Sequence, residues 1–93
     1  NRDFFSASSK NLTSLENDGN LLNAKYLYIQ SNKLKSLKGI ELIPNLEEIA
    51  IYNNTLKDIS DLKDLNKLMH ISASKKTIPE RYHRFLNEYD NIN

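Results

Sequence analysis

LYIQSNKLKSLKGIELI, residues 27–43, and IAIYNNTLKDISDLKDL, residues 49–65, carry apolar side chains at matching positions 22 residues apart. The same columns extend to both sides as Phe5/Leu27/Ile49/Ile71, Ala7/Ile29/Ile51/Ala73, Leu12/Leu34/Leu56/Ile78 and Leu15/Leu37/Ile59. A fixed period of this length is the signature of a repeat architecture, in which each unit buries its apolar side only against its neighbours. The chain of 93 residues is therefore interpreted as a stack of four rows forming one domain, residues 1–93.

Two periodicities alternate within each row. Leu27-Tyr28-Ile29 and Ile49-Ala50-Ile51 alternate between apolar and outward positions, which predicts a strand. From residue 34 to residue 46 apolar residues then recur every third position, which predicts a return of 3₁₀ or short helical turns. Four parallel strands should therefore form one curved sheet, with the helical returns on the opposite, convex side.

Asn32 and Asn54 occupy the same row position just after the strand. A buried amide at this point can satisfy backbone groups of adjacent rows, which explains why the position holds Asn and not a hydrophobe. We expect a structural role for both. The first and last rows carry Lys10 and Lys76 there instead, a departure that is typical of terminal rows.

Residues 27–43 and 49–65 resemble the 22-residue class of leucine-rich repeat, as found in bacterial internalins and in phosphatase regulatory subunits. The motif Leu-x-Ile-x-x-Asn-x-Leu-x-x-Leu/Ile carries the resemblance, and the run 43–49, IPNLEEI, is typical of that class. The clear repeats cover residues 24–73, and residues 1–23 form a degenerate first repeat. The resemblance implies a short α/β solenoid that binds another macromolecule, but such folds do not specify the partner.

The two ends of the chain depart from the repeat. Residues 77–90 predict an amphipathic helix that covers the last row, because Tyr82, Phe85, Leu86 and Tyr89 follow helical spacing. Thr77 and Glu80 predict a capping box at its start. The alternative is that the same stripe contacts a partner. Residues 16–23 fit either a short helix or an irregular turn.

The outward strand positions predict a binding surface, which we call the strand face. Neighbouring parallel strands lie about 4.8 Å apart, so these side chains should gather in one patch. The candidate binding residues are Tyr26, Tyr28, Gln30, Glu48, Tyr52 and His70. Tyrosine offers apolar area and a polar tip, which suits protein recognition. The alternative is that tyrosine simply favours half-exposed strands.

Composition and motifs argue against several other classes of function. The chain has no cysteine, no Gly-rich phosphate loop and no His pair at metal-ligand spacing, so we expect no enzyme, no metal and no cofactor. A formal net charge of +1 argues against a nucleic-acid binder. No apolar run is long enough to span a membrane. A cytoplasmic location is slightly favoured, and a secreted or surface location fits if the N-terminus was processed.

Function is therefore predicted as protein–protein interaction through the concave strand face of a monomer. One alternative makes the chain a structural segment or spacer of a longer leucine-rich-repeat protein. A weaker alternative is binding of an anionic ligand or nucleic acid through a C-terminal basic cluster. That cluster comprises Lys75, Lys76, Arg81, His83 and Arg84.

Overall fold

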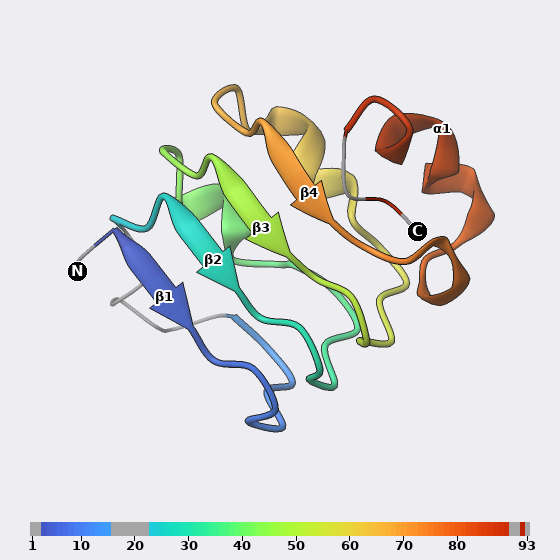
Figure 1. The fold of residues 1–93 in the computed structure, drawn as a ribbon, viewed down its shortest axis with the longest axis horizontal. Helices are drawn as coiled ribbons and strands as arrows, with labels where there is room; N and C mark the ends of the chain where they lie inside the picture. The colour runs from blue at the N-terminus through green and yellow to red at the C-terminus, as the bar shows by residue number, and fades with distance from the viewer. Residues whose placement is uncertain (1–2, 16–22, 90–91, 93) are drawn as a thin grey trace.

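Four short strands form one parallel sheet in a computed structural model of the chain, which describes residues 3–15, 23–89 and 92. The strands are β1 (Phe4–Ser6), β2 (Tyr26–Tyr28), β3 (Glu48–Ala50) and β4 (His70–Ser72). They lie side by side in chain order (Figure 1). Paired residues are 22 positions apart, since Phe4 pairs with Tyr26, Tyr26 with Glu48, and Glu48 with His70. The predicted four-stranded parallel sheet and its register are confirmed.

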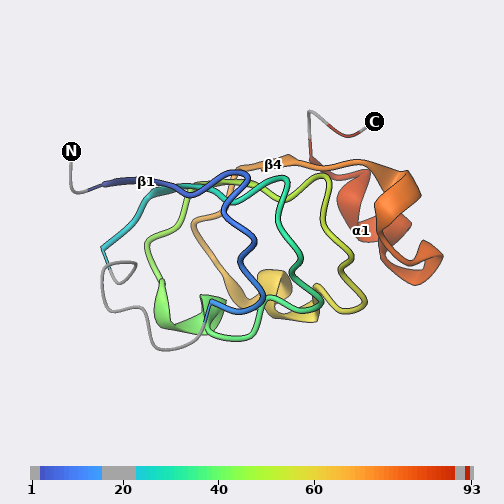
Figure 2. The same ribbon diagram turned by 90° about the horizontal axis from the view of Figure 1, so that it is seen from below.

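The returns between strands contain the short 3₁₀ turns that the three-residue spacing predicts. η2 (Ile40–Leu42) and η3 (Ser60–Asp64) lie on the side of the molecule opposite the sheet (Figure 2). With three residues per turn, every third side chain points the same way. Ile40 and Leu62 accordingly point inward and are buried in these turns.

The core lies between the sheet and the returns and is built from the repeated columns. The predicted columns between residues 24 and 73 are buried throughout, and the largest fully buried side chains are Leu27, Ile29, Leu34, Leu37, Ile40, Ile43, Leu46, Ile49, Ile51, Ile59, Leu62 and Ile71. In the first row Leu15 is buried, but Phe5 and Leu12 are only partly so. Each inner row is therefore sandwiched between two neighbours, which is how the repeat buries its apolar side.

Asn32 and Asn54 link the backbones of adjacent rows, as predicted. The amide of Asn32 donates to the carbonyl of Ile29 in its own row at 3.0 Å and to that of Ala7 in the previous row at 2.9 Å. Asn54 repeats this with Ile51 and Ile29, both at 3.1 Å. The side-chain oxygens accept from backbone N–H groups of the previous row, those of Lys10 and Leu12 for Asn32 and that of Leu34 for Asn54.

A left-handed residue precedes each of these positions, a feature that we did not predict. Ser9, Ser31 and Asn53 have φ of 58°, 59° and 58°. If strand side chains continued to alternate after the inward Ile29, residue 31 would point inward. The buried residue is instead Asn32. The left-handed residue therefore shifts the alternation by one position. Such a conformation costs on the order of 1–3 kcal/mol in a residue other than glycine, and asparagine tolerates it best.

The C-terminal segment is less helical than predicted. It contains η4 (Lys75–Thr77), η5 (Glu80–Tyr82) and α1 (His83–Leu86), so the continuous helix expected over residues 77–90 is wrong in length; residue 90 lies outside the described part. The predicted capping box is also wrong. Ile78 is extended before Pro79, as residues preceding proline prefer, and the Thr77 hydroxyl donates to Ser74 O instead.

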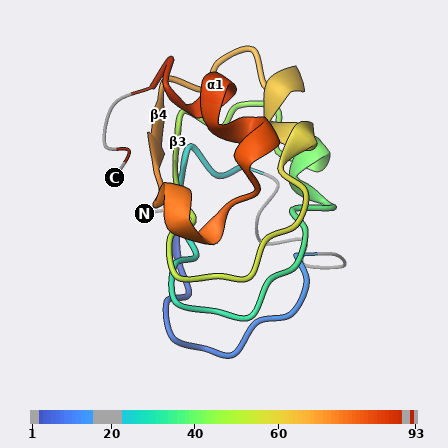
Figure 3. The ribbon, with the colours of Figure 1, turned by 90° about the vertical axis from the view of Figure 1, so that its right-hand side faces the viewer.

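The apolar stripe nevertheless covers the last row, as predicted. Tyr82 and Leu86 are buried in the core cluster, and Phe85 and Tyr89 pack against it. Figure 3 shows α1 lying across the end of the sheet beyond β4. Residue 92 then forms a parallel bridge with Ala73 at the end of β4. The expectation for residues 16–23 lies outside the described residues, apart from Asn23 in a turn.

Replacing Asn54 by Ala should lower the free energy of unfolding by about 2–4 kcal/mol, because buried backbone groups of two rows lose their partners. Denaturant unfolding monitored by circular dichroism measures this change. The control is Asn66→Ala, which changes an exposed asparagine and should cost little. Equal stability of the two variants would contradict a structural role for Asn54.

Leu86→Ala should cost about 2–5 kcal/mol, since it opens a cavity where the C-terminal segment meets the core. Arg84→Ala in the same helix changes an exposed side chain and is the matched control. Thermal unfolding of both variants tests the capping role. A Leu86→Ala variant as stable as the wild type would show that the last row needs no cover.

Candidate functional site

The strand face brings the predicted binding residues together. Within the sheet, the outward side chains run across the strands in two columns, Phe4/Tyr26/Glu48/His70 and Ser6/Tyr28/Ala50/Ser72. Gln30 and Tyr52 follow β2 and β3 directly, and all six predicted residues are half-buried. The helical segments lie on the other side of the sheet or beyond β4 (Figures 2 and 3). The outward side chains are thus held by a rigid sheet while their tips stay accessible.

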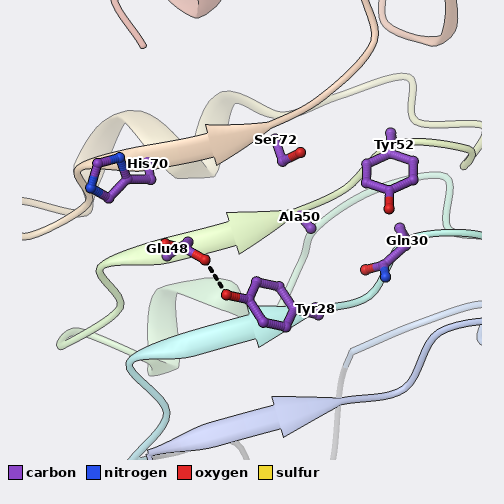
Figure 4. Close-up of a pocket in the computed structure, with 7 residues that line it drawn as sticks. All are labelled: Tyr28, Gln30, Glu48, Ala50, Tyr52, His70 and Ser72. Carbon is purple, nitrogen blue, oxygen red and sulfur yellow. Dashed lines mark hydrogen bonds between the residues drawn. The ribbon is translucent and has the colours of Figure 1, made fainter. Parts of the chain in front are cut away.

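A hollow of about 280 Å³ lies at the centre of this face. It is lined by Tyr28, Gln30, Glu48, Ala50, Tyr52, His70 and Ser72 (Figure 4). Five of the six predicted residues belong to this lining, whereas Tyr26 does not. Ala50 and Ser72 were not predicted as site residues. They lie side by side across β3 and β4, and their small side chains leave room between the larger ones.

Tyr28 and Glu48 are joined on the face by a hydrogen bond. The Tyr28 hydroxyl donates to Oε2 of Glu48, as Figure 4 shows. This bond stabilises the protonated phenol, and together with partial burial and the Glu48 charge it raises the pKa of Tyr28 above 10.0. On its other side the Tyr28 ring meets Phe4 edge to face, with ring centroids 5.1 Å apart. These two contacts therefore hold the Tyr28 ring in position.

Gln30 carries an unpaired acceptor. Its Oε1 is shielded from solvent and has no hydrogen-bond partner among the described residues. A buried polar atom in this state costs about 1–3 kcal/mol, so such atoms are rare in folded proteins. In Figure 4 the hydroxyl end of Tyr52 points toward Gln30, and the carboxamide oxygen faces the interior of the group. The sequence contained no signal for this unpaired atom.

The two histidines lie on different elements. His70 lies in β4 beside Glu48, whereas His83 lies in α1. His83 Nε2 is within hydrogen-bond distance of two carbonyl oxygens, Lys75 O at 3.0 Å and Ile78 O at 2.9 Å. Because both partners are acceptors, Nε2 carries the proton and donates. His83 thus fixes the chain before α1. Across residues 3–15, 23–89 and 92, no His, Asp and Glu residues gather as a metal site.

Two members of the predicted basic cluster make intramolecular contacts. The guanidinium of Arg81 lies over the Tyr82 ring, 4.7 Å from its centroid, and donates to the carbonyl of Lys57 at 2.7 Å. His83 binds backbone carbonyls, as described above. Arg81 and His83 therefore help to attach the C-terminal segment to the row before it, which accounts for part of the local basic charge.

Neither a protein-family model nor any curated protein sequence matches this chain significantly. Within the described part of the chain, no helix is long and apolar enough to cross a membrane.

Glu48→Gln should lower the pKa of Tyr28 toward its ordinary value. The variant lacks the carboxylate that accepts a hydrogen bond from the phenol and repels the phenolate. Because the folded pKa is raised, this bond stabilises the fold fully below about pH 10, the ordinary value, and the stabilisation is lost as pH rises through the folded pKa. NMR titration of the Tyr28 ring carbon Cζ measures the change. Glu47→Gln removes the same charge one residue earlier and should leave the pKa of Tyr28 unaltered. Identical titration of Tyr28 in the two variants would contradict its pairing with Glu48.

Proposed function

We propose that this chain is a short leucine-rich-repeat solenoid whose strand face binds a protein partner. The observation that carries the proposal is the hollow, which gathers two tyrosines, a glutamate, a glutamine and a histidine from three adjacent rows. The repeat assignment is supported by the register of 22 residues, the asparagine pair and the 3₁₀ returns. In such a solenoid, the strand side offers an extended surface for binding.

The chemistry of the face suits protein recognition. Tyr28 and Tyr52 offer flat apolar rings with polar tips, and their side chains lose little rotamer entropy on binding. Tyr28 is already held by Glu48 and Phe4, which lowers the entropy cost further. A face of four three-residue strands is small, so it fits an interface at the low end of the usual size range, below about 1,200 Å². We therefore propose a compact or transient contact.

An enzymatic role is not part of the proposal. Ser72 lines the hollow with His70 and Glu48, but its sequence context, Ile71-Ser72-Ala73, contains no nucleophile motif. The Glu48 carboxylate accepts from Tyr28, which suits positioning of that ring. Binding through the C-terminal basic cluster is also less favoured, since Arg81 and His83 already serve the fold.

The double variant Tyr28→Ala/Tyr52→Ala should lose the partner while keeping most of its thermal stability. Affinity purification from cells of the source organism, compared quantitatively between wild type and variant, identifies candidates. Calorimetry with the purified partner then measures the loss, which should reach at least about 2 kcal/mol for a pair of central tyrosines.

The control for this experiment is Leu42→Ala. It removes an apolar side chain that is 60% exposed on η2, on the opposite side from the sheet. Partner binding should be unaffected by this change. Equal binding by the wild type and the tyrosine double variant would overturn the proposal and favour a spacer role within a longer protein.

A further inference from the structure

We propose that the hollow on the strand face receives an arginine side chain of the protein partner. The inference rests on the proposed function and names the group that the site recognises. Its basis is the juxtaposition in Figure 4 of a carboxylate, an unpaired carboxamide oxygen and two tyrosine rings. Together these features suit a cationic hydrogen-bond donor.

The charge of the lining is the first argument. Among the residues that the structure describes, Glu48 is the only carboxylate lining the hollow, and no lysine or arginine lines it. A carboxylate can accept about four hydrogen bonds, and Tyr28 occupies one of these positions. Glu48 therefore retains acceptor capacity toward an incoming donor. An acidic occupant would meet the same carboxylate in a half-enclosed space and be repelled.

Gln30 supplies the second argument. Its Oε1 has no hydrogen-bond partner in the described part of the chain, and its side chain lines the hollow. Because the residue is only half-buried, a rotation of the carboxamide brings the oxygen toward an occupant. A donor that binds there gives a hydrogen-bond partner to an atom that has none among the described residues. An occupant made only of acceptors or apolar groups leaves the oxygen unpaired.

Size and ring geometry select arginine among cationic donors. A volume of about 280 Å³ lies below the usual range for sites of drug-sized ligands, about 300–1,000 Å³, and suits a single side chain. A guanidinium is planar, stacks on aromatic rings and carries five donors, so it can stack on a tyrosine ring while its N–H groups donate to side-chain oxygens that line the hollow. The protein already contains this arrangement at another place, where Arg81 lies over the Tyr82 ring and donates to a carbonyl oxygen.

The test is a ¹⁵N–¹H NMR titration of the full chain with N-acetyl-arginine-N-methylamide. Saturable shifts should centre on the amides of Gln30, Glu48, Ala50 and Tyr52, with millimolar affinity. The citrulline analogue, which is neutral and nearly the same shape, should bind at least about tenfold more weakly because it loses the charge-assisted hydrogen bonds. The lysine analogue keeps the charge but lacks the planar fork of five donors, and it should also bind at least about tenfold more weakly.

Gln30→Leu and Glu48→Gln should each weaken the arginine probe by about tenfold. The matched control Glu47→Gln removes an equal charge outside the lining and should change nothing. Thermal unfolding checks that each variant is folded. If Gln30→Leu fails to fold, Gln30→Met, which keeps the length of the side chain without the polar group, takes its place.

Three outcomes would overturn the inference: equal binding of arginine and citrulline, equal binding of arginine and lysine, or shifts centred away from the hollow. Its failure is distinguishable from failure of the proposed function. A partner that is lost by Tyr28→Ala/Tyr52→Ala yet unaffected by Glu48→Gln and Gln30→Leu would retain the function and exclude the arginine site. All of these variants losing the partner, together with loss of binding when one arginine of the partner is mutated, would support both the proposed function and the arginine site.

Discussion

The structure depends on one constraint, which is that no row of this chain can bury its apolar side alone. Ile49 is enclosed because Leu27 and Ile71 lie in register on either side of it. The same register must also satisfy the backbone, since the loops after the strands enter the interior. Asn32 and Asn54 perform this second task, and the left-handed residues before them turn their amides inward. Packing and hydrogen bonding therefore require the same period of 22 residues.

This constraint also explains why the candidate site lies where it does. Every inward position of a strand is used by the core, so variation without loss of stability is confined to the outward positions. There the chain places tyrosines, Glu48 and Gln30 around the small side chains of Ala50 and Ser72. The hollow is thus a consequence of unequal side-chain sizes on a regular sheet and needs no irregular loop.

Features that depend on the repeat could be predicted from the sequence, whereas those that depend on single contacts could not. Strand pairing, the buried columns, the asparagine bonds and the gathering of Tyr28, Glu48 and Tyr52 all follow from aligning rows. The bond from Tyr28 to Glu48 and the unpaired Gln30 oxygen depend on rotamers, which periodicity does not determine. Helical spacing of the apolar residues predicted a C-terminal helix that starts earlier than the one that forms, because the backbone is extended at Ile78 and Pro79. The apolar stripe of Tyr82, Phe85, Leu86 and Tyr89 still contacts the core, because these residues lie on a common face of the shorter helical segments.

The bridge between Ala73 and residue 92 has a consequence for solubility. A parallel sheet presents unpaired N–H and C=O groups along its last strand, and such an edge is a template for pairing with another molecule. Here the chain folds back after α1 and places its own backbone at the end of β4, while Phe85 and Tyr89 pack over the last row. The C-terminal segment thus pairs with the backbone just after β4 and leaves less of this edge open to another strand. Main-chain pairing after Ser72, and not surface charge alone, therefore limits strand addition at this end of the sheet.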